Sequence, residues 1–127
     1  MYRIKLTNET DANNAQAGVL LPRQVRTLEL EAEFDPRATF LSLPAEAVAA
    51  LGLPLREWRR IQRSDASYIE LPVARSLDVE ILGRGMTCDA LVLPAGSTPV
   101  IGRRELATLD LTLDPDSREL VLGRSWP

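Results

Sequence analysis

The residue best suited to chemistry in this sequence is Asp35, which stands at a turn directly after a strand-like stretch. The chain contains no histidine and only one cysteine, so Ser-His-Asp triads, Cys-His pairs and metal sites built from histidine and cysteine are excluded. Carboxylates are the main source of acid–base chemistry that remains. The residues after Asp35 complete a candidate active-site loop: Pro36, Arg37, Ala38 and Thr39.

A predicted strand leads into this loop, and a predicted helix follows it. Apolar and polar residues alternate strictly over residues 26–34, which predicts a strand with one buried face. The glutamates on its polar face fit a solvated outer surface better than a binding site for a cationic partner. Beyond the loop, Pro44 suits the first turn of a helix, residues 45–51 are mostly good helix formers, and Gly52 suits the C-terminal cap.

Short strands at close spacing dominate the rest of the sequence. Period-two alternation predicts strands at residues 2–6, 69–73, 77–81, 86–92, 109–113 and 119–122, with a hairpin over 77–92. A short helix is expected at residues 101–107, and the polar residues 7–18 are expected to form a loop. Residues 55–61 fit either a basic amphipathic turn or a strand with a charged edge. Together these elements indicate a mainly β fold of the sandwich or barrel type.

The composition fits one domain over residues 1–127, because 45% apolar residues can supply one core and the chain is too short for two full domains. A net charge of −3 and an aromatic content of 5% argue against nucleic acid as a partner. Four arginines lie close together, and for them a solvated or ion-paired face is favoured over a site for an anionic ligand. They are Arg56, Arg59, Arg60 and Arg63.

Targeting and redox features favour a cytoplasmic location. The N-terminal residues lack an apolar core run, and no window approaches the length of a membrane span. The single cysteine, Cys88, cannot form an intrachain disulfide, and a small buried apolar role is favoured over a reactive thiol. We therefore expect a soluble, cytoplasmic chain that uses no cofactor or metal and binds neither nucleic acid nor a membrane.

Three segments, taken in order along the chain, carry a family resemblance. The first is Asp35-x-x-Ala38-Thr39 with the apolar run and helix that follow it. The second is the turn Ser64-Asp65-Ala66-Ser67, and the third joins residues 89–94 to residues 99–103. These segments resemble the Asp-Thr-Gly-Ala-Ser/Thr loop, the flap turn and the Ile-Gly-Arg region of the retropepsin-like (clan AA) aspartic peptidases. The resemblance is particularly to the small bacterial aspartyl-protease-like members of that superfamily.

The resemblance implies a fold, an assembly and a site. The fold would be a retropepsin-like acid-protease half-barrel with short helices, and two copies would pair about a two-fold axis as a homodimer. Members of the family hydrolyse peptides with two aspartates, one from each copy, that share a proton because two adjacent carboxylates do not both ionise readily. By resemblance, Asp35 is the catalytic position, and residues 64–67 form the flap.

Three residues depart from the family's pattern. Pro36 replaces a threonine and has neither a hydroxyl nor a backbone donor, Arg37 replaces a glycine, and Ala66 stands where relatives carry a flap glycine. An Arg37 guanidinium that reaches Asp35 would keep both carboxylates ionised and disfavour the shared proton. We therefore expect a catalytically impaired or inactive homodimer, a pseudoenzyme that binds extended peptide segments. The alternative is an active aspartic endopeptidase that uses a pair of Asp35 side chains.

Overall fold

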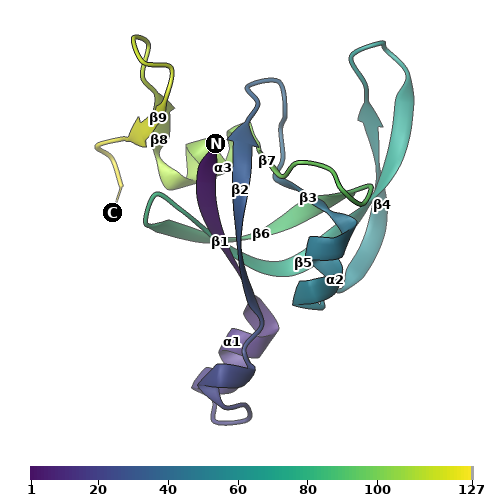
Figure 1. Ribbon diagram of the computed structural model, residues 1–127, viewed down its shortest axis with the longest axis vertical. Coiled ribbons are helices and arrows are strands. Elements are labelled where there is room, and N and C mark those ends of the chain that lie inside the picture. The colour runs from purple at the N-terminus through teal and green to yellow at the C-terminus, as the bar shows by residue number, and fades with distance from the viewer. Residues whose placement is uncertain (127) are drawn as a thin grey trace.

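Nine strands and three α-helices make up residues 1–126, the part of the chain that the computed structural model describes (Figure 1). The strands are β1 Tyr2–Asn8, β2 Thr27–Phe34, β3 Ser42–Pro44, β4 Leu55–Gln62, β5 Tyr68–Ile81, β6 Arg84–Leu93, β7 Val100–Ile101, β8 Leu111–Leu113 and β9 Leu120–Leu122. The helices are α1 Glu9–Gln16, α2 Ala45–Leu51 and α3 Arg103–Leu109, with a 3-10 turn at Pro22–Gln24. Within this described part, no helix has the length and apolar character that crossing a membrane requires.

Six of the strands close into a barrel, which confirms the prediction of a mainly β fold of the barrel type. Their order is β1-β2-β7-β3-β6-β5, and β5 pairs antiparallel with β1 to complete the ring. The strand β4 extends the sheet beyond β5, so that the β4–β5 hairpin projects from the barrel (Figure 1). The β8–β9 hairpin forms a separate two-stranded sheet. The barrel is filled by inward-facing aliphatic side chains that are fully buried, among them Ile4, Leu6, Leu41, Leu43, Leu77 and Ile81.

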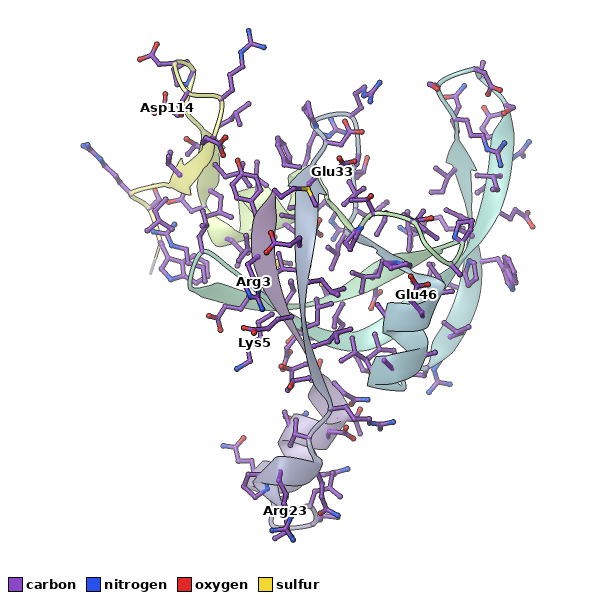
Figure 2. All side chains as sticks on the ribbon, viewed as in Figure 1. Arg3, Lys5, Arg23, Glu33, Glu46 and Asp114 are labelled. Atoms are coloured by element: carbon purple, nitrogen blue, oxygen red, sulfur yellow. The ribbon has the colours of Figure 1, made fainter. Side chains whose placement is uncertain are left out.

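The strand β2 has the two faces that its alternation predicts. Ala32 is fully buried against the core, whereas the glutamates of the strand are exposed. Arg3 on β1 donates to Glu29 at 3.3 Å and to Glu31 at 3.5 Å. Figure 2 shows Arg3 and Lys5 on β1 and Glu33 at the end of β2. The acidic row is thus an exposed outer face that is partly neutralised by ion pairing.

The prediction of a loop over residues 7–18 is wrong, because β1 continues to Asn8 and α1 follows it directly. Asn8 caps this helix by accepting from the Asp11 N–H at 3.0 Å, and its side-chain amide donates to the Leu51 carbonyl at 2.8 Å. Asp11 in turn accepts two hydrogen bonds from the Arg26 guanidinium, at 2.7 and 3.1 Å. A polar sequence is therefore helical because its side chains bind groups that are distant along the chain.

Other boundaries differ from the sequence prediction in ways that the structure explains. The two strands expected at residues 69–73 and 77–81 are one strand, β5, interrupted by an irregularity after Ala74 where Ser76 has a φ of 62°. The alternatives left open for residues 55–61 resolve as the strand β4. The helix expected at residues 101–107 begins later, as α3 at Arg103, because Val100 and Ile101 pair with β2 as the strand β7.

The helix α2 is present as predicted, and its C-terminal cap is Gly52 with a φ of 64°. A Cβ at Gly52 would overlap the Arg26 guanidinium, with its nearest nitrogen only 1.9 Å away. The left-handed backbone conformation therefore favours glycine at this position, and any other residue would also require the Arg26 side chain to move.

We expect Asn8→Ala to lower the free energy of unfolding by roughly 2 kcal/mol, because it removes the cap of α1 and leaves the Leu51 carbonyl without its partner. Urea unfolding followed by circular dichroism measures this loss. Asn13→Ala is the matched control, since Asn13 lies in the same helix with an exposed side chain. Equal destabilisation by both substitutions would contradict the proposed role of Asn8.

Candidate functional site

The candidate active-site loop begins at the end of β2 and is tied to β7 and α3 by backbone hydrogen bonds. The Asp35 N–H donates to the Ile101 carbonyl at 3.3 Å. The N–H groups of Arg103 and Arg104 donate to the carbonyls of Ala38 and Thr39 at 2.9 and 3.0 Å. The first turn of α3 thus satisfies the carbonyls of the loop and fixes it against the barrel.

This contact requires Gly102, which precedes α3. A Cβ at Gly102 would lie 2.6 Å from the Thr39 carbonyl group and from the Phe40 nitrogen. Those atoms belong to the backbone, so no side-chain rotation can relieve the overlap. The glycine at this position therefore permits the close approach of the loop and the helix.

Asp35 is bound by the arginine two residues later in the chain. Its carboxylate accepts from the Arg37 backbone N–H at 2.9 Å and from the Arg37 Nε and Nη2 at 3.1 and 3.3 Å. The two guanidinium contacts reach different carboxylate oxygens, so the pair is bidentate. Hydrogen bonds from the Arg37 side chain and backbone hold the pKa of Asp35 below its ordinary value of 3.8.

The loop and the β4–β5 hairpin enclose a groove with a volume of about 610 Å³, which we call the loop–hairpin groove. The loop contributes polar and charged residues to one side, and the hairpin contributes the end of β4 and the first residues of its turn. Aliphatic side chains from β4, β5 and β6 form the remaining wall. The lining residues include Asp35, Arg37, Ala38, Thr39, Arg60, Ile61, Arg63, Ser64, Leu71, Leu91 and Leu93.

The turn between β4 and β5 contains an alanine in a left-handed conformation. Ala66 has a φ of 69°, in the left-handed region that a glycine adopts readily and an alanine adopts at a cost of about 1 kcal/mol. The side chain of Asp65 accepts from the Ser67 N–H at 3.0 Å and from the Ser67 hydroxyl. These bonds hold the turn in one conformation.

The structure therefore brings most of the predicted site residues to one groove. Asp35, Arg37, Ala38, Thr39 and Ser64 line it together. The side chains of Pro36, Asp65, Ala66 and Ser67 are not part of the lining. Among residues 1–126, no three histidine, cysteine, aspartate or glutamate side chains are grouped so that they could hold a metal ion.

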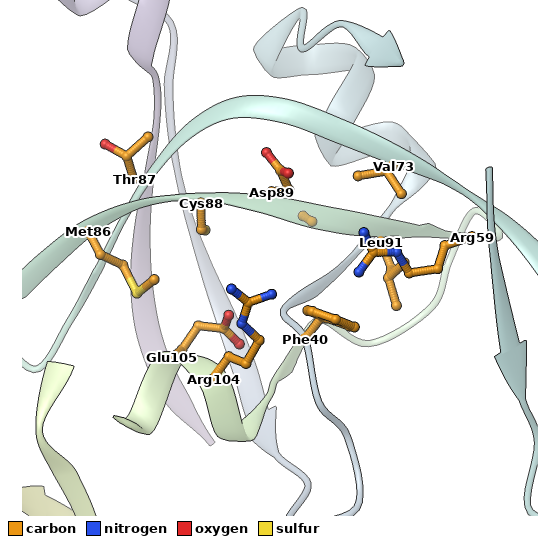
Figure 3. Close-up of a pocket in the computed structure, with 11 residues that line it drawn as sticks. Phe40, Arg59, Val73, Met86, Thr87, Cys88, Asp89, Leu91, Arg104 and Glu105 are labelled. Atoms are coloured by element: carbon orange, nitrogen blue, oxygen red, sulfur yellow. The ribbon is translucent and has the colours of Figure 1, made fainter. Parts of the chain in front are cut away.

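A second cavity, with a volume of about 300 Å³, lies between α3 and β6 (Figure 3). Glu105 and Arg104 project into it from α3, towards Cys88 and its neighbours on β6. Phe40 lies beside them, with the guanidinium carbons of Arg59 and Arg104 at 4.7 and 5.1 Å from the centre of its ring. Burial raises the pKa of the Cys88 thiol to about 12, so the thiol is neutral and unreactive at neutral pH.

Glu105 is the residue in this region that the sequence analysis missed. It is only 2% exposed, and its carboxylate accepts from the Gly102 N–H at 2.9 Å. Burial raises the pKa of Glu105 to about 7. The spacing Gly102-x-x-Glu105 resembles half of a capping box and was a usable signal for the hydrogen bond. No local pattern indicates that the carboxyl is buried.

Comparison with known proteins does not identify the chain. No protein-family model matches the sequence, and no curated protein matches it. The geometry of the groove and of its charged residues is therefore the basis for the function that follows.

Ionisation of Glu105 should make the fold less stable as the pH rises from about 4.5 to about 7. The pKa of Glu105 is about 7 in the folded chain, against 4.5 for an ordinary glutamate. The protonated carboxyl therefore stabilises the fold fully below about pH 4.5, and this contribution is lost above about pH 7. Glu105→Gln keeps an acceptor for Gly102 but cannot ionise. Over this pH range, the free energy of unfolding of the variant should rise by roughly 3 kcal/mol relative to that of the wild type.

Urea unfolding at a series of pH values measures this difference. The range is favourable because the chain has no histidine. Glu33→Gln is the control, since Glu33 is exposed on β2. Parallel pH profiles for the wild type and the Glu105 variant would show that the buried carboxyl does not titrate in this way.

Proposed function

We propose that this chain is a retropepsin-like protein that forms a homodimer and binds extended peptide segments without cleaving them. The observation that carries the proposal is the bidentate pair between Arg37 and Asp35. Aspartic peptidases need one proton shared between two carboxylates. An arginine bound to each Asp35 favours the ionised form of both, which disfavours the shared proton.

The loop–hairpin groove supports the binding of an extended segment. It lies between the Asp35 loop and the projecting hairpin, which correspond to the active-site loop and the flap in the resemblance to the retropepsin-like family. Within residues 1–126, β4 pairs only with β5 and is the last strand of the sheet. Its other edge offers backbone N–H and C=O groups to which a peptide strand can bind.

Exposed apolar side chains support the association of two copies. Four of them lie on the β8–β9 hairpin and the segment after it, outside the barrel: Leu113, Val121, Leu122 and Trp126. A surface of this kind commonly marks a protein–protein contact, because the apolar area is removed from water when a partner covers it. A second copy of the chain would cover this area in the proposed homodimer.

One observation favours the alternative, an active aspartic endopeptidase. The side chain of Arg37 is 84% exposed, whereas that of Asp35 is 28% exposed. Solvent weakens an ion pair at such a site, so a bound substrate or a second subunit has little energy to overcome in displacing the guanidinium. Asp35 would then be free to share a proton with its symmetry mate.

Incubation of the purified protein with a diverse peptide library, from acid to neutral pH, separates the two functions. We expect no cleavage by the folded wild-type protein, because Arg37 disfavours the proton that two Asp35 carboxylates would have to share. Asp35→Asn is the control, and cleavage by the wild type that disappears in this variant would establish the endopeptidase instead. Sedimentation of the same samples measures the assembly, and a monomer at micromolar concentration would contradict the homodimer.

Arg37→Gly should raise the pKa of Asp35, because the substitution removes the guanidinium that stabilises the carboxylate and keeps only the backbone N–H of residue 37 as a donor. Titration of the side-chain carboxyl carbon by NMR measures this change directly. Arg63→Ala is the matched control, since Arg63 lines the same groove without a hydrogen bond to Asp35. An unchanged titration of Asp35 in the Arg37 variant would remove the basis for proposing inactivity.

A further inference from the structure

The loop–hairpin groove has a charge opposite to that of the whole chain. The chain carries a net charge of −3. The charged residues that line the groove are three arginines and one aspartate, so the groove carries a net charge of +2. They are Arg37, Arg60, Arg63 and Asp35. A cleft with this local excess attracts anionic groups in preference to cationic ones.

The excess charge belongs to two arginines of the hairpin. Arg37 is neutralised by Asp35, to which it is bound. Arg60 and Arg63 form no ion pair within residues 1–126, and both are exposed. The guanidinium of Arg60 lies 4.2 Å from the centre of the Tyr68 ring, a contact that orients it and leaves its donors free. Two guanidinium groups that no ion pair neutralises therefore belong to the part of the hairpin that lines the groove.

The rest of the groove is apolar. Ile61, Leu71, Leu91 and Leu93 line it, and Leu71 and Leu91 are buried. An extended peptide turns successive side chains to opposite sides, so one strand can present aliphatic groups to this wall and carboxylates to the arginines. Nucleic acid fits less well, because its charged backbone would lie against aliphatic side chains in a chain that is negative overall.

We infer that the loop–hairpin groove selects an acidic extended peptide in which carboxylate and aliphatic side chains alternate. The inference rests on the proposed function, since it names the class of peptide that the same groove binds. The carboxylates pair with Arg60 and Arg63, and the aliphatic side chains contact the apolar wall. The backbone of the peptide pairs with the free edge of the hairpin.

Fluorescence anisotropy with three labelled peptides of equal length tests this inference. The peptides alternate valine with glutamate, with glutamine or with lysine. We expect the glutamate peptide to bind at least about tenfold more tightly than the glutamine peptide, and the lysine peptide to bind most weakly. Added salt should reduce the preference for the glutamate peptide, because the arginines that produce it are exposed.

Substitutions in the groove locate the selectivity. The double variant Arg60→Glu with Arg63→Glu should reverse the preference, so that the lysine peptide binds more tightly than the glutamate peptide. Arg56→Ala is the control, because Arg56 is an exposed arginine of the same strand that does not line the groove. It should leave the order of the three affinities unchanged.

The outcomes distinguish failure of the inference from failure of the proposed function. Equal binding of the three peptides, or a preference that persists in the double variant, would overturn the selectivity and leave peptide binding intact. No binding of any peptide by the folded dimer would overturn both. A single-stranded oligonucleotide that binds more tightly than the glutamate peptide, and loses affinity in the double variant, would assign the arginines to nucleic acid instead.

Discussion

The close backbone contact between Gly102 and the segment Thr39–Phe40 is the constraint on which the rest of the site depends. Because Gly102 has no Cβ, the first turn of α3 approaches the loop closely enough for its N–H groups to bind the carbonyls of Ala38 and Thr39. The same segment is joined to the barrel through β7, which pairs with both β2 and β3. The position of Asp35 is thus set by backbone atoms, which leaves its side chain free to respond to its neighbours.

Two carboxyl groups near this contact have opposite electrostatic environments. Asp35 is partly exposed and bound to a guanidinium, which stabilises its ionised form. Glu105 is buried beside the same loop, and burial favours its neutral form. The acid with the raised pKa is therefore Glu105, which accepts a hydrogen bond at the start of α3, whereas the pKa of Asp35 is lowered. This division supports a binding role for the groove.

Local patterns in the sequence predicted the parts of the fold that are stabilised locally. The strand β2, the helix α2 and the hairpin of β5 and β6 follow from alternation, helix formers and turn residues. The contact between Arg37 and Asp35 was foreseeable because only one residue separates them. The helix α1 was missed because its stability depends on Arg26 and on the Leu51 carbonyl, which are distant along the chain.

The candidate site shows the same limit. The sequence predicted the loop and the turn as separate segments, and the fold of the barrel determines that they face one groove. The guanidinium groups of Arg59 on β4 and Arg104 on α3 both lie over the ring of Phe40 in the loop. Because these residues come from three separate segments, no spacing along the chain indicates the contact. Burial of Glu105 likewise depends on β6, which lies across the second cavity from α3. Long-range packing, rather than local propensity, therefore decides the chemistry of these side chains.

The pair of Asp35 with Arg37 also changes what dimerisation requires. In a two-fold assembly of ordinary aspartic peptidase subunits, two carboxylates meet and repel each other unless the dimer takes up a proton. In the homodimer proposed for this chain, each carboxylate arrives with its own guanidinium, so the charges at the axis are already balanced. Association then needs no proton. The stability of this proposed dimer is therefore expected to change little over the pH range in which the shared proton of a catalytic dimer titrates. In the proposed homodimer, an arginine at position 37 would thus both disfavour a shared proton and reduce the repulsion between the two Asp35 carboxylates.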